Sequence, residues 1–229
     1  MQTTDWSNIT SDLNENGYSL IKHALTYDQC DDLISLYGDN SYFRKTINME
    51  RYRFGKGEYK YFNYPLPAII EHLRKQLYEP LSTIANDWMN KLQIRRTFPS
   101  THVELLSLCN SSDQTKPTPL ILRYTKGGYN TVHQDLYGEV YFPFQAVFLL
   151  NQHGEDYEGG EFVLLQQNPR AQSKAIVVQP SRGDAVLFPT NFRPAQGSRG
   201  FYRAVMRHGV SEVKSGMRYS LGIIFHDAT

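Results

Sequence analysis

The chain has 229 residues, of which 40% are hydrophobic, 21% charged and 13% aromatic. This composition excludes a disordered, collagen-like or coiled-coil protein, and the length allows one large domain or two small ones. Lys and Arg together number 24 against 23 Asp and Glu, which gives a net charge of +1. Any nucleic-acid partner must therefore be met by a local basic patch and not by a global positive field.

Targeting signals and cysteine content indicate the compartment. Cys30 and Cys109 are too few for a disulfide scaffold or a thiolate zinc site. The N-terminal residues lack the basic and apolar regions of a signal peptide, and the longest unbroken apolar run, 146–150, is far short of the roughly 20 residues that span a bilayer. We expect a cytoplasmic protein with reduced cysteines, no membrane association and no obligate partner.

Helical patterns occupy much of the first hundred residues. Asp28 is placed to cap a helix that Gly38 ends, with apolar residues at helical spacing between them. A longer apolar series over 69–92 predicts a second helix, which Pro80 is expected to break. We expect residues 1–100 to form a helical support that packs on a larger core.

A basic and aromatic segment lies between these two helices. Over 51–62, aromatic and charged residues alternate on both sides of a glycine turn at 55–58, which is typical of a β-hairpin. One face of this hairpin would carry Tyr52, Phe54, Tyr59 and Tyr61. That face could pack on the core, or the hairpin could cover a site as a substrate lid, and the pattern leaves both open.

Short strands separated by glycine-containing turns follow from about residue 103. The predicted strands are 103–108, 119–125, 144–150, 161–165, 175–179, 184–188, 202–210 and 217–225. A series of about eight strands without helices between them favours a closed barrel or a jelly roll. We therefore predict a mainly β fold with N-terminal helices, in which residues 101–229 form the core.

Three His-x-acid triplets, at 102–104, 133–135 and 153–155, could supply metal ligands. In an extended segment, residues i and i+2 project to the same side, so His133 and Asp135 would converge on one point. With one distant histidine such a pair forms the 2-His-1-carboxylate triad of non-haem Fe(II) oxygenases. The spacing alone is weak, because such triplets also occur among solvated or helix-capping polar groups.

The sequence around His208 favours the triplet at 133–135. His208 lies 75 residues after His133, in a predicted strand whose alternation directs it to the same side as Ala204 and Met206. His226 is a rival distal ligand, but only three residues follow it, and no strand remains to anchor a co-substrate.

Arg218 and Ser220 share one face of the last predicted strand. A buried guanidinium beside a metal requires an anion, because an unpaired buried charge is very costly. The distal carboxylate of 2-oxoglutarate would meet Arg218, with Ser220 donating a further hydrogen bond. The alternative is an internal salt bridge from Arg218 to Asp184 or Glu161.

Taken in this order, several motifs resemble the Fe(II)/2-oxoglutarate-dependent dioxygenase superfamily over about residues 117–228. The motifs are 122–127, 133–135, 159–162, 183–188, 207–211 and 218–220. The stretches 117–120, 133–139 and 222–228 resemble one bacterial branch, for which a role in oxidative demethylation of damaged nucleic acid has been proposed.

The resemblance implies a double-stranded β-helix over 101–229 that binds Fe(II), 2-oxoglutarate and O2. Its implied metal ligands are His133, Asp135 and His208. Arg218 would anchor 2-oxoglutarate, and Tyr124 matches a position that often donates a hydrogen bond to it. The implied reaction couples decarboxylation of 2-oxoglutarate to succinate with hydroxylation of a substrate; at an N-methyl group the product would collapse to formaldehyde.

The substrate stays open between nucleic acid and protein side chains. Tyr124-x-x-Gly127 followed by 133–135 is similar to AlkB-type demethylases, and the 51–62 segment precedes the barrel as their nucleotide-gripping lid does. Those enzymes carry a second arginine six residues after the co-substrate arginine, where this chain has Ile224. The ten-residue spacing from His208 to Arg218 is closer to prolyl 4-hydroxylase-type enzymes.

Two further alternatives concern the class of protein and a basic cluster. A non-catalytic, cupin-like binding module is disfavoured, because a cupin usually has a second histidine where Asp135 stands. A group of arginines near the predicted site could cover the barrel exterior or contact phosphates, and it comprises Arg193, Arg199, Arg203 and Arg207. Strand alternation points Arg203 and Arg207 away from His208, which favours the exterior.

Overall fold

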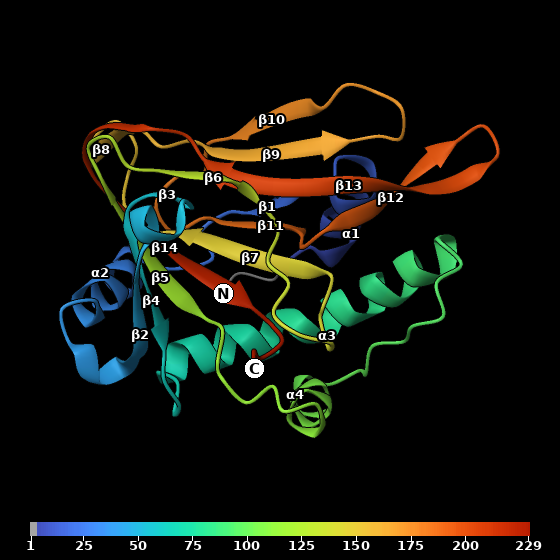
Figure 1. Cartoon of the computed structure of the whole chain (residues 1–229), viewed down its shortest axis with the longest axis horizontal. Helices are drawn as coiled ribbons and strands as arrows, with labels where there is room; N and C mark the ends of the chain where they lie inside the picture. The colour runs from blue at the N-terminus through green and yellow to red at the C-terminus, as the bar shows by residue number, and fades with distance from the viewer. Residues whose placement is uncertain (1–3) are drawn as a thin grey trace.

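Two antiparallel β-sheets face each other in the computed structural model, which describes residues 4–229 (Figure 1). Residues 1–3 of the predicted N-terminal support lie outside the described residues. The larger sheet, in spatial order, consists of β1 (Ser19–Ile21), β11 (Ala185–Pro189), β7 (Phe144–Leu149), β14 (Val213–Ile224), β5 (Leu120–Thr125), β4 (Glu58–Phe62) and β2 (Phe43–Asn48), with β8 (Tyr157–Gly159) paired to β14. The smaller sheet consists of β10 (Lys174–Val178), β9 (Phe162–Gln167), β13 (Gly200–Val210), β6 (Tyr129–His133) and β3 (Gly55–Lys56), with β12 (Phe192–Gly197) paired to β13. This arrangement confirms the mainly β, jelly-roll prediction.

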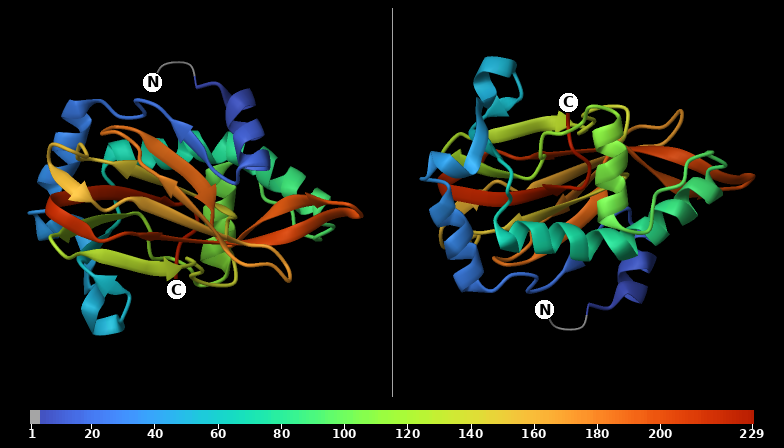
Figure 2. Two further views of the ribbon diagram at one scale, coloured as in Figure 1. Left: turned by 90° about the horizontal axis from the view of Figure 1, so that it is seen from above. Right: turned by 90° about the horizontal axis from the view of Figure 1, so that it is seen from below.

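Helices cover the outer face of the larger sheet (Figure 2). They are α1 (Trp6–Glu15), α2 (Tyr27–Leu36), α3 (Ala68–Lys91) and α4 (His102–Ser111). The longest, α3, buries Leu77, Leu81 and Trp88, and the Trp88 ring centroid lies 4.5 Å from that of Phe144 on β7. Each such buried side chain contributes about 1.5–3 kcal/mol through removal of apolar surface from water. The helices therefore buttress the barrel, as predicted.

Two details of the predicted helices are wrong. Thr26, and not Asp28, caps α2, and it forms a capping box with Gln29. Pro80 does not break α3, which runs unbroken through it. A proline inside a helix costs about 3 kcal/mol, but Leu77 and Leu81 on either side of Pro80 are fully buried, and this packing outweighs the cost.

The predicted strand at 103–108 is also wrong, because these residues lie in α4. The Thr101 hydroxyl accepts a hydrogen bond from the Glu104 backbone N–H, and the Glu104 carboxylate accepts one from the Thr101 backbone N–H. Leu105 and Cys109 are buried at a spacing of four residues. This capping box was the signal for a helix in the sequence.

The aromatic segment forms a hairpin, but not the one predicted over 51–62. β2 pairs with β4, so that Ile47 lies opposite Tyr59, and residues 49–57 leave the sheet between them. We call residues 49–57 the rim segment. It contains a short 3-10 helix (Met49–Tyr52), a left-handed turn at Arg53 and then β3, which crosses to pair with β6 of the smaller sheet. A second short 3-10 helix (Asn40–Tyr42) precedes β2.

None of the helices within residues 4–229 combines the length and the apolar character needed to cross a bilayer. Cys30 and Cys109 are both buried and free.

Candidate active site

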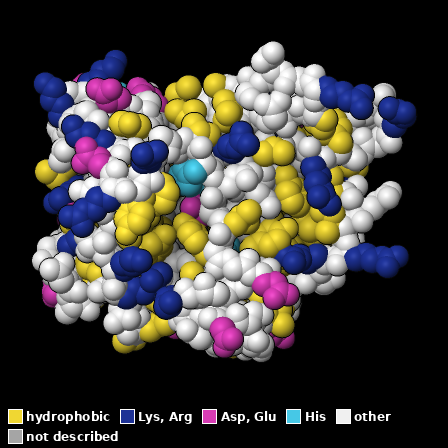
Figure 3. Space-filling model, in the orientation of Figure 1, with side chains coloured by type: hydrophobic (Ala, Val, Ile, Leu, Met, Phe, Trp, Pro, Cys, Tyr) yellow, Lys and Arg dark blue, Asp and Glu magenta, His cyan; other side chains and the backbone are white. Residues whose placement is uncertain are grey.

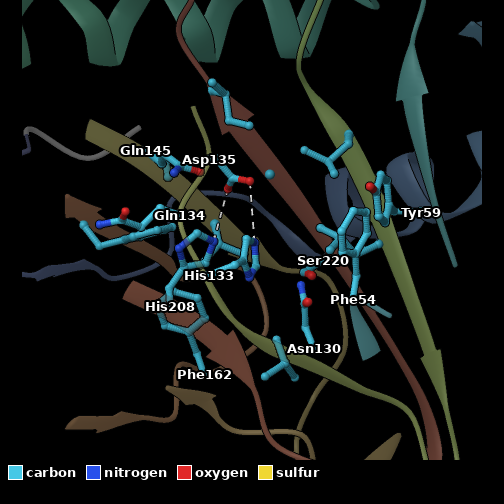
Figure 4. Close-up of a pocket in the computed structure, with 18 of the residues that line it drawn as sticks. Phe54, Tyr59, Asn130, His133, Gln134, Asp135, Gln145, Phe162, His208 and Ser220 are labelled. Carbon is cyan, nitrogen blue, oxygen red and sulfur yellow. Dashed lines mark ion pairs between the residues drawn. The ribbon is translucent and has the colours of Figure 1, made fainter. Parts of the chain in front are cut away.

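His133, Asp135 and His208 lie together between the two sheets (Figure 4). His133 ends β6 and pairs directly with His208 on the neighbouring strand β13, so that their ring centroids are 4.3 Å apart. The Asp135 carboxylate reaches both rings, with Oδ1 3.5 Å from His133 Nε2 and Oδ2 3.2 Å from His208 Nε2. One potential ligand atom of each residue lies within 4.8 Å of the other two.

Local hydrogen bonds fix the direction of each side chain. Gln134 points away from its two neighbours and donates to the carbonyl oxygens of Asn191 and Met206, both at 2.8 Å. His133 Nδ1 lies 2.7 Å from the Thr131 carbonyl oxygen, which can only accept, so Nδ1 donates there and Nε2 is the ring nitrogen that faces Asp135. Such a bond to the outer nitrogen orients a metal-binding imidazole.

The surroundings of this group favour an ionised Asp135 carboxylate and a neutral His208. Burial by itself would raise the pKa of Asp135, but its contacts with His133 and His208 outweigh burial and hold that pKa well below its usual range. Burial and the nearby His133 lower the pKa of His208. The Tyr137 hydroxyl donates to Asp135 Oδ1 at 2.6 Å and holds the carboxylate in place.

Arg218 lies in the same cavity, and its side chain is 1% exposed. It lies opposite Tyr124 in the β14–β5 register, with its guanidinium carbon 5.7 Å from the Tyr124 ring centroid. Its Nη1 donates to Ser220 Oγ at 3.1 Å. Gly160 makes room for this side chain, because a Cβ at Gly160 would come within 2.9 Å of Arg218 Cδ.

Within residues 4–229 no carboxylate pairs with Arg218, so neither alternative salt bridge forms. Asp184 instead accepts hydrogen bonds from Lys22 and from the His23 backbone, and Glu161 accepts from the Ser211 hydroxyl. The buried guanidinium thus faces the cavity without a charge partner, and an anion is the chemical complement that it lacks.

A single cavity of about 210 Å³ contains all six predicted site residues. Its walls are largely apolar, and Phe188 and Phe162 flank His208 with ring centroids 4.8 and 6.0 Å away. The metal-binding group and Arg218 direct their polar atoms into this otherwise apolar cavity. A few polar groups in an apolar cavity are typical of a ligand-binding site.

The residues present fit Fe(II) and 2-oxoglutarate. Two imidazoles and one carboxylate form the facial donor set that suits non-haem Fe(II). Residues of this cavity contribute four buried polar atoms without a partner among the described residues: His208 Nδ1, Tyr124 Oη, Gln145 Nε2 and Arg218 Nε. Burial raises the pKa of Tyr124 to about 12, so its hydroxyl keeps the proton needed to donate. A dicarboxylate beside a metal would satisfy donors that otherwise cost about 1–3 kcal/mol each.

The rival histidines lie elsewhere. His226 is fully buried, its Nδ1 accepts from the Phe142 backbone N–H at 3.1 Å, and burial lowers its pKa to about 3. His102 Nε2 lies 2.8 Å from the Phe225 carbonyl oxygen. His153 faces Glu158 at 3.7 Å and is partly exposed. None of these three belongs to the metal-binding group.

Sequence reasoning missed several residues of the cavity. Tyr137 continues the alternation of His133 and Asp135, so the same period of two could have placed it beside the carboxylate. Phe188 lies in a correctly predicted strand, but its contact with His208 depends on how the sheets face each other. Gln145 and Asn130 also line the cavity and carried no recognisable signal.

Comparison with known proteins assigns the class. The fold matches a prolyl 4-hydroxylase of Pseudomonas putida (TM-score 0.57, 14% identity, 98% of this chain and 100% of that one). It also matches a 2OG-Fe(II) oxygenase family oxidoreductase of Burkholderia pseudomallei (TM-score 0.58, 14% identity, 100% of this chain and 94% of that one). A third match is a Trichoplax adhaerens prolyl hydroxylase in complex with a hypoxia-inducible-factor peptide (TM-score 0.54, 16% identity, 97% of this chain and 89% of that one). These matches show the fold of the Fe(II)/2-oxoglutarate oxygenases.

Residues 57–228 match the Oxygenase-NA family, which is described as an oxygenase "catalysing oxidative methylation of damaged DNA". The chain belongs to this family. An uncharacterized protein of Mycobacterium tuberculosis, found in two strains, is 43% identical over 167 residues, which cover 73% of this chain and 72% of the relative. The protein is therefore an oxidoreductase of the Fe(II)/2-oxoglutarate superfamily, whose reactions use Fe(II), 2-oxoglutarate and O2.

Proposed function

We propose that His133, Asp135 and His208 hold Fe(II), and that Arg218, Ser220 and Tyr124 hold 2-oxoglutarate. Bound iron, with 2-oxoglutarate and O2, supplies an oxidant for C–H bonds. Arg218 would pair with the distal carboxylate, and Ser220 and Tyr124 would donate to the co-substrate. Phe162 and Phe188 exclude water beside His208, and Tyr137 keeps the Asp135 carboxylate directed at the metal position.

The reaction we propose is oxidative removal of a methyl group from damaged nucleic acid. One oxygen atom of O2 enters succinate as CO2 leaves 2-oxoglutarate, and the other enters the substrate as a hydroxyl on the methyl carbon. A hydroxymethyl group on nitrogen then breaks its C–N bond to release formaldehyde, and the nitrogen takes up the proton. Oxidation of a methyl group thus leads to its loss.

The rim segment carries the nucleic-acid assignment. Tyr52 and Phe54 are stacked on each other, with ring centroids 5.5 Å apart and an interplanar angle of 16°, yet they are 52% and 45% exposed. Phe54 also lines the cavity. Exposed aromatic rings at the mouth of a site form a surface on which a base can stack, worth about 1–3 kcal/mol per base.

The other aromatic residues of the predicted hairpin have a structural role. Tyr61 is buried, and Tyr59 is half-buried in the cavity wall. The two alternatives for this segment thus apply to different residues: the β4 tyrosines pack on the core and the rim aromatics face solvent. The backbone N–H and the hydroxyl of Thr131 both donate to the Phe54 carbonyl oxygen and fix the rim segment to β6, the strand that carries His133.

Charge on the same side of the molecule supports an anionic substrate. Arg51, Arg53 and Lys56 of the rim segment are exposed. Figure 3 shows a histidine and an acidic side chain in a depression, with Lys and Arg side chains on both sides of it and few acidic ones nearby. A net charge of +1 is therefore unevenly distributed, and cations surround the opening where phosphates would lie.

Formaldehyde release from N-methylated oligonucleotides tests this assignment. We expect turnover by the wild type, and a KM raised roughly 5- to 100-fold in Tyr52→Ala and Phe54→Ala, because each removes a stacking surface. Tyr27→Ala is the matched control, since Tyr27 is 55% exposed but does not line the cavity. Equal KM values in all three variants would exclude the rim segment from substrate binding.

A protein substrate is the second candidate, because the ten-residue spacing from His208 to Arg218 is similar to that of prolyl 4-hydroxylase-type enzymes. Succinate release, measured with proline-containing peptides and with N-methylated oligonucleotides, distinguishes the two candidates. Succinate release driven by peptides alone would replace the nucleic-acid proposal. No succinate release with any substrate would favour a non-catalytic, cupin-like module.

We also place the enzyme in the cytoplasm. Two buried, free cysteines and a ferrous ion are both suited to a reducing compartment.

A further inference from the structure

Three cations far from the rim segment are held over aromatic rings. The Arg96 guanidinium lies 4.5 Å from the Tyr141 ring centroid, and that of Arg203 lies 5.3 Å from Phe192. At the end of α3, Lys91 Nζ is 5.5 Å from the ring centroid of Phe201, a β13 residue that is 42% exposed. We call the surface formed by Lys91, Arg95, Arg96, Arg199, Phe201 and Arg203 the flank surface.

Acidic side chains compensate little of this charge. Arg95, Arg96, Arg199 and Arg203 are exposed, and none of them forms an ion pair within the described part of the chain. Only Lys91 has a carboxylate partner, Asp87, in a 2.6 Å pair. In Figure 3, Lys and Arg side chains border a hydrophobic patch over the β12–β13 hairpin and the end of α3. Exposed cations beside aromatic rings suit phosphates and bases together.

Arg193, which the sequence grouped with these arginines, has a different role. It is buried and donates to the carbonyl oxygens of Asn14 and Glu15 at the end of α1, and to Gln166 Oε1 on β9. These bonds fix the base of the β12–β13 hairpin to the body of the protein. The flank surface is therefore held at a constant distance from the metal-binding group.

That distance can be read along one strand. β13 carries His208 on its inner face and Arg203 five residues earlier on its outer face. Five residues of strand span about 17 Å. Successive phosphates of one DNA strand are spaced by about 3.4 Å along the helix axis, so the flank surface lies about five nucleotides from the reacting base.

We propose that the flank surface binds the DNA backbone about five nucleotides from the base that enters the cavity. The inference rests on the proposed function and adds to it a second contact region, on the opposite side of the opening from the rim segment. The rim segment would hold the damaged base, and the flank surface would hold the flanking duplex.

The triple variant Arg96→Gln/Arg199→Gln/Arg203→Gln tests this surface. For a methylated 20-mer duplex, we expect weaker binding and a log–log salt dependence whose slope is smaller by about 3, one for each lost phosphate contact. For a methylated trinucleotide, we expect the same KM as in the wild type, because it cannot reach the surface. A charge-matched control, Lys75→Gln/Lys126→Gln/Lys214→Gln, removes three exposed cations elsewhere and should leave the slope closer to that of the wild type.

The outcomes separate this inference from the proposed function. An unchanged slope in the flank variant, with methylated duplex still turned over, would overturn the flank surface alone. The flank surface would also be overturned if the control variant lowered the salt-dependence slope as much as the flank variant does. The same holds if the flank variant lost as much affinity for an acidic peptide as for the methylated duplex. A wild type that turns over no methylated oligonucleotide would overturn the proposed function itself.

Discussion

Hydrogen bonds hold the Asp135 carboxylate in the direction that the alternation of the chain gives it. Asp135 follows the end of β6, and its carboxylate is held by Tyr137 on one oxygen and contacts His208 through the other. The Tyr137 hydroxyl in turn accepts a hydrogen bond from the Tyr61 hydroxyl at 3.2 Å. A carboxylate fixed in this way loses little side-chain entropy when it binds a metal.

The anchor for 2-oxoglutarate is the most direct single-residue test. Arg218→Lys keeps a positive charge but loses the planar, bidentate guanidinium, so we expect KM for 2-oxoglutarate to rise about 10- to 100-fold, from the loss of about 1.5–3 kcal/mol. Ser220→Ala loses one neutral hydrogen bond and should raise it less, about 2- to 10-fold. Steady-state succinate formation measures both. An unchanged KM in Arg218→Lys would exclude Arg218 as the anchor.

Strand alternation made the inward-pointing residues predictable. It gave the shared directions of His133 with Asp135, of Ala204 with His208, and of Arg218 with Ser220. Which aromatic rings meet His208 was not predictable. Phe162 contacts it because β9 pairs with β13 in the smaller sheet, whereas Phe188 contacts it only because the larger sheet packs against the smaller one.

Segments at the edge of the barrel were harder to predict than its strands. The aromatic alternation of 51–62 suggested a hairpin with its turn at 55–58. In the structure β2 pairs with β4, and the connection between them, 49–57, crosses to the smaller sheet, where β3 pairs with β6. The left-handed turn at Arg53, with φ 59°, ends the 3-10 helix and allows that crossing. No local pattern shows that a two-residue strand will pair with a distant one.

The C-terminal end of β14 is held by a buried ion pair. Arg74 of α3 meets Asp227 at 2.6 Å, and their side chains are 1% and 3% exposed. Asp227→Asn would leave the guanidinium buried without a charge partner, and we expect the free energy of unfolding to fall by about 3–5 kcal/mol. Urea denaturation measures this change.

The control for that variant is an exposed pair on the same helix. Asp87→Asn breaks the pair between Asp87 and Lys91, which are four residues apart on α3, and should cost only about 0.3–0.5 kcal/mol. Similar losses in the two variants would contradict a specific role for the buried pair at the end of β14.

The assembled molecule brings together residues that are far apart in the chain. His133 and His208 are 75 residues apart and meet because β6 and β13 pair, whereas Tyr124 and Arg218 meet because β5 and β14 pair. The jelly roll therefore builds its two binding groups from two different sheets that enclose one cavity. The net charge of +1 therefore gives no indication of the two basic regions beside the opening, which are the rim segment and the flank surface.

Anaerobic titration with Fe(II) and 2-oxoglutarate, followed by visible absorption, tests the assignment of both groups together. We predict a weak charge-transfer band in the wild type that is lost in His208→Ala and needs more 2-oxoglutarate to appear in Arg218→Lys. A band that persists in His208→Ala, or a wild type without one, would contradict the proposed iron site.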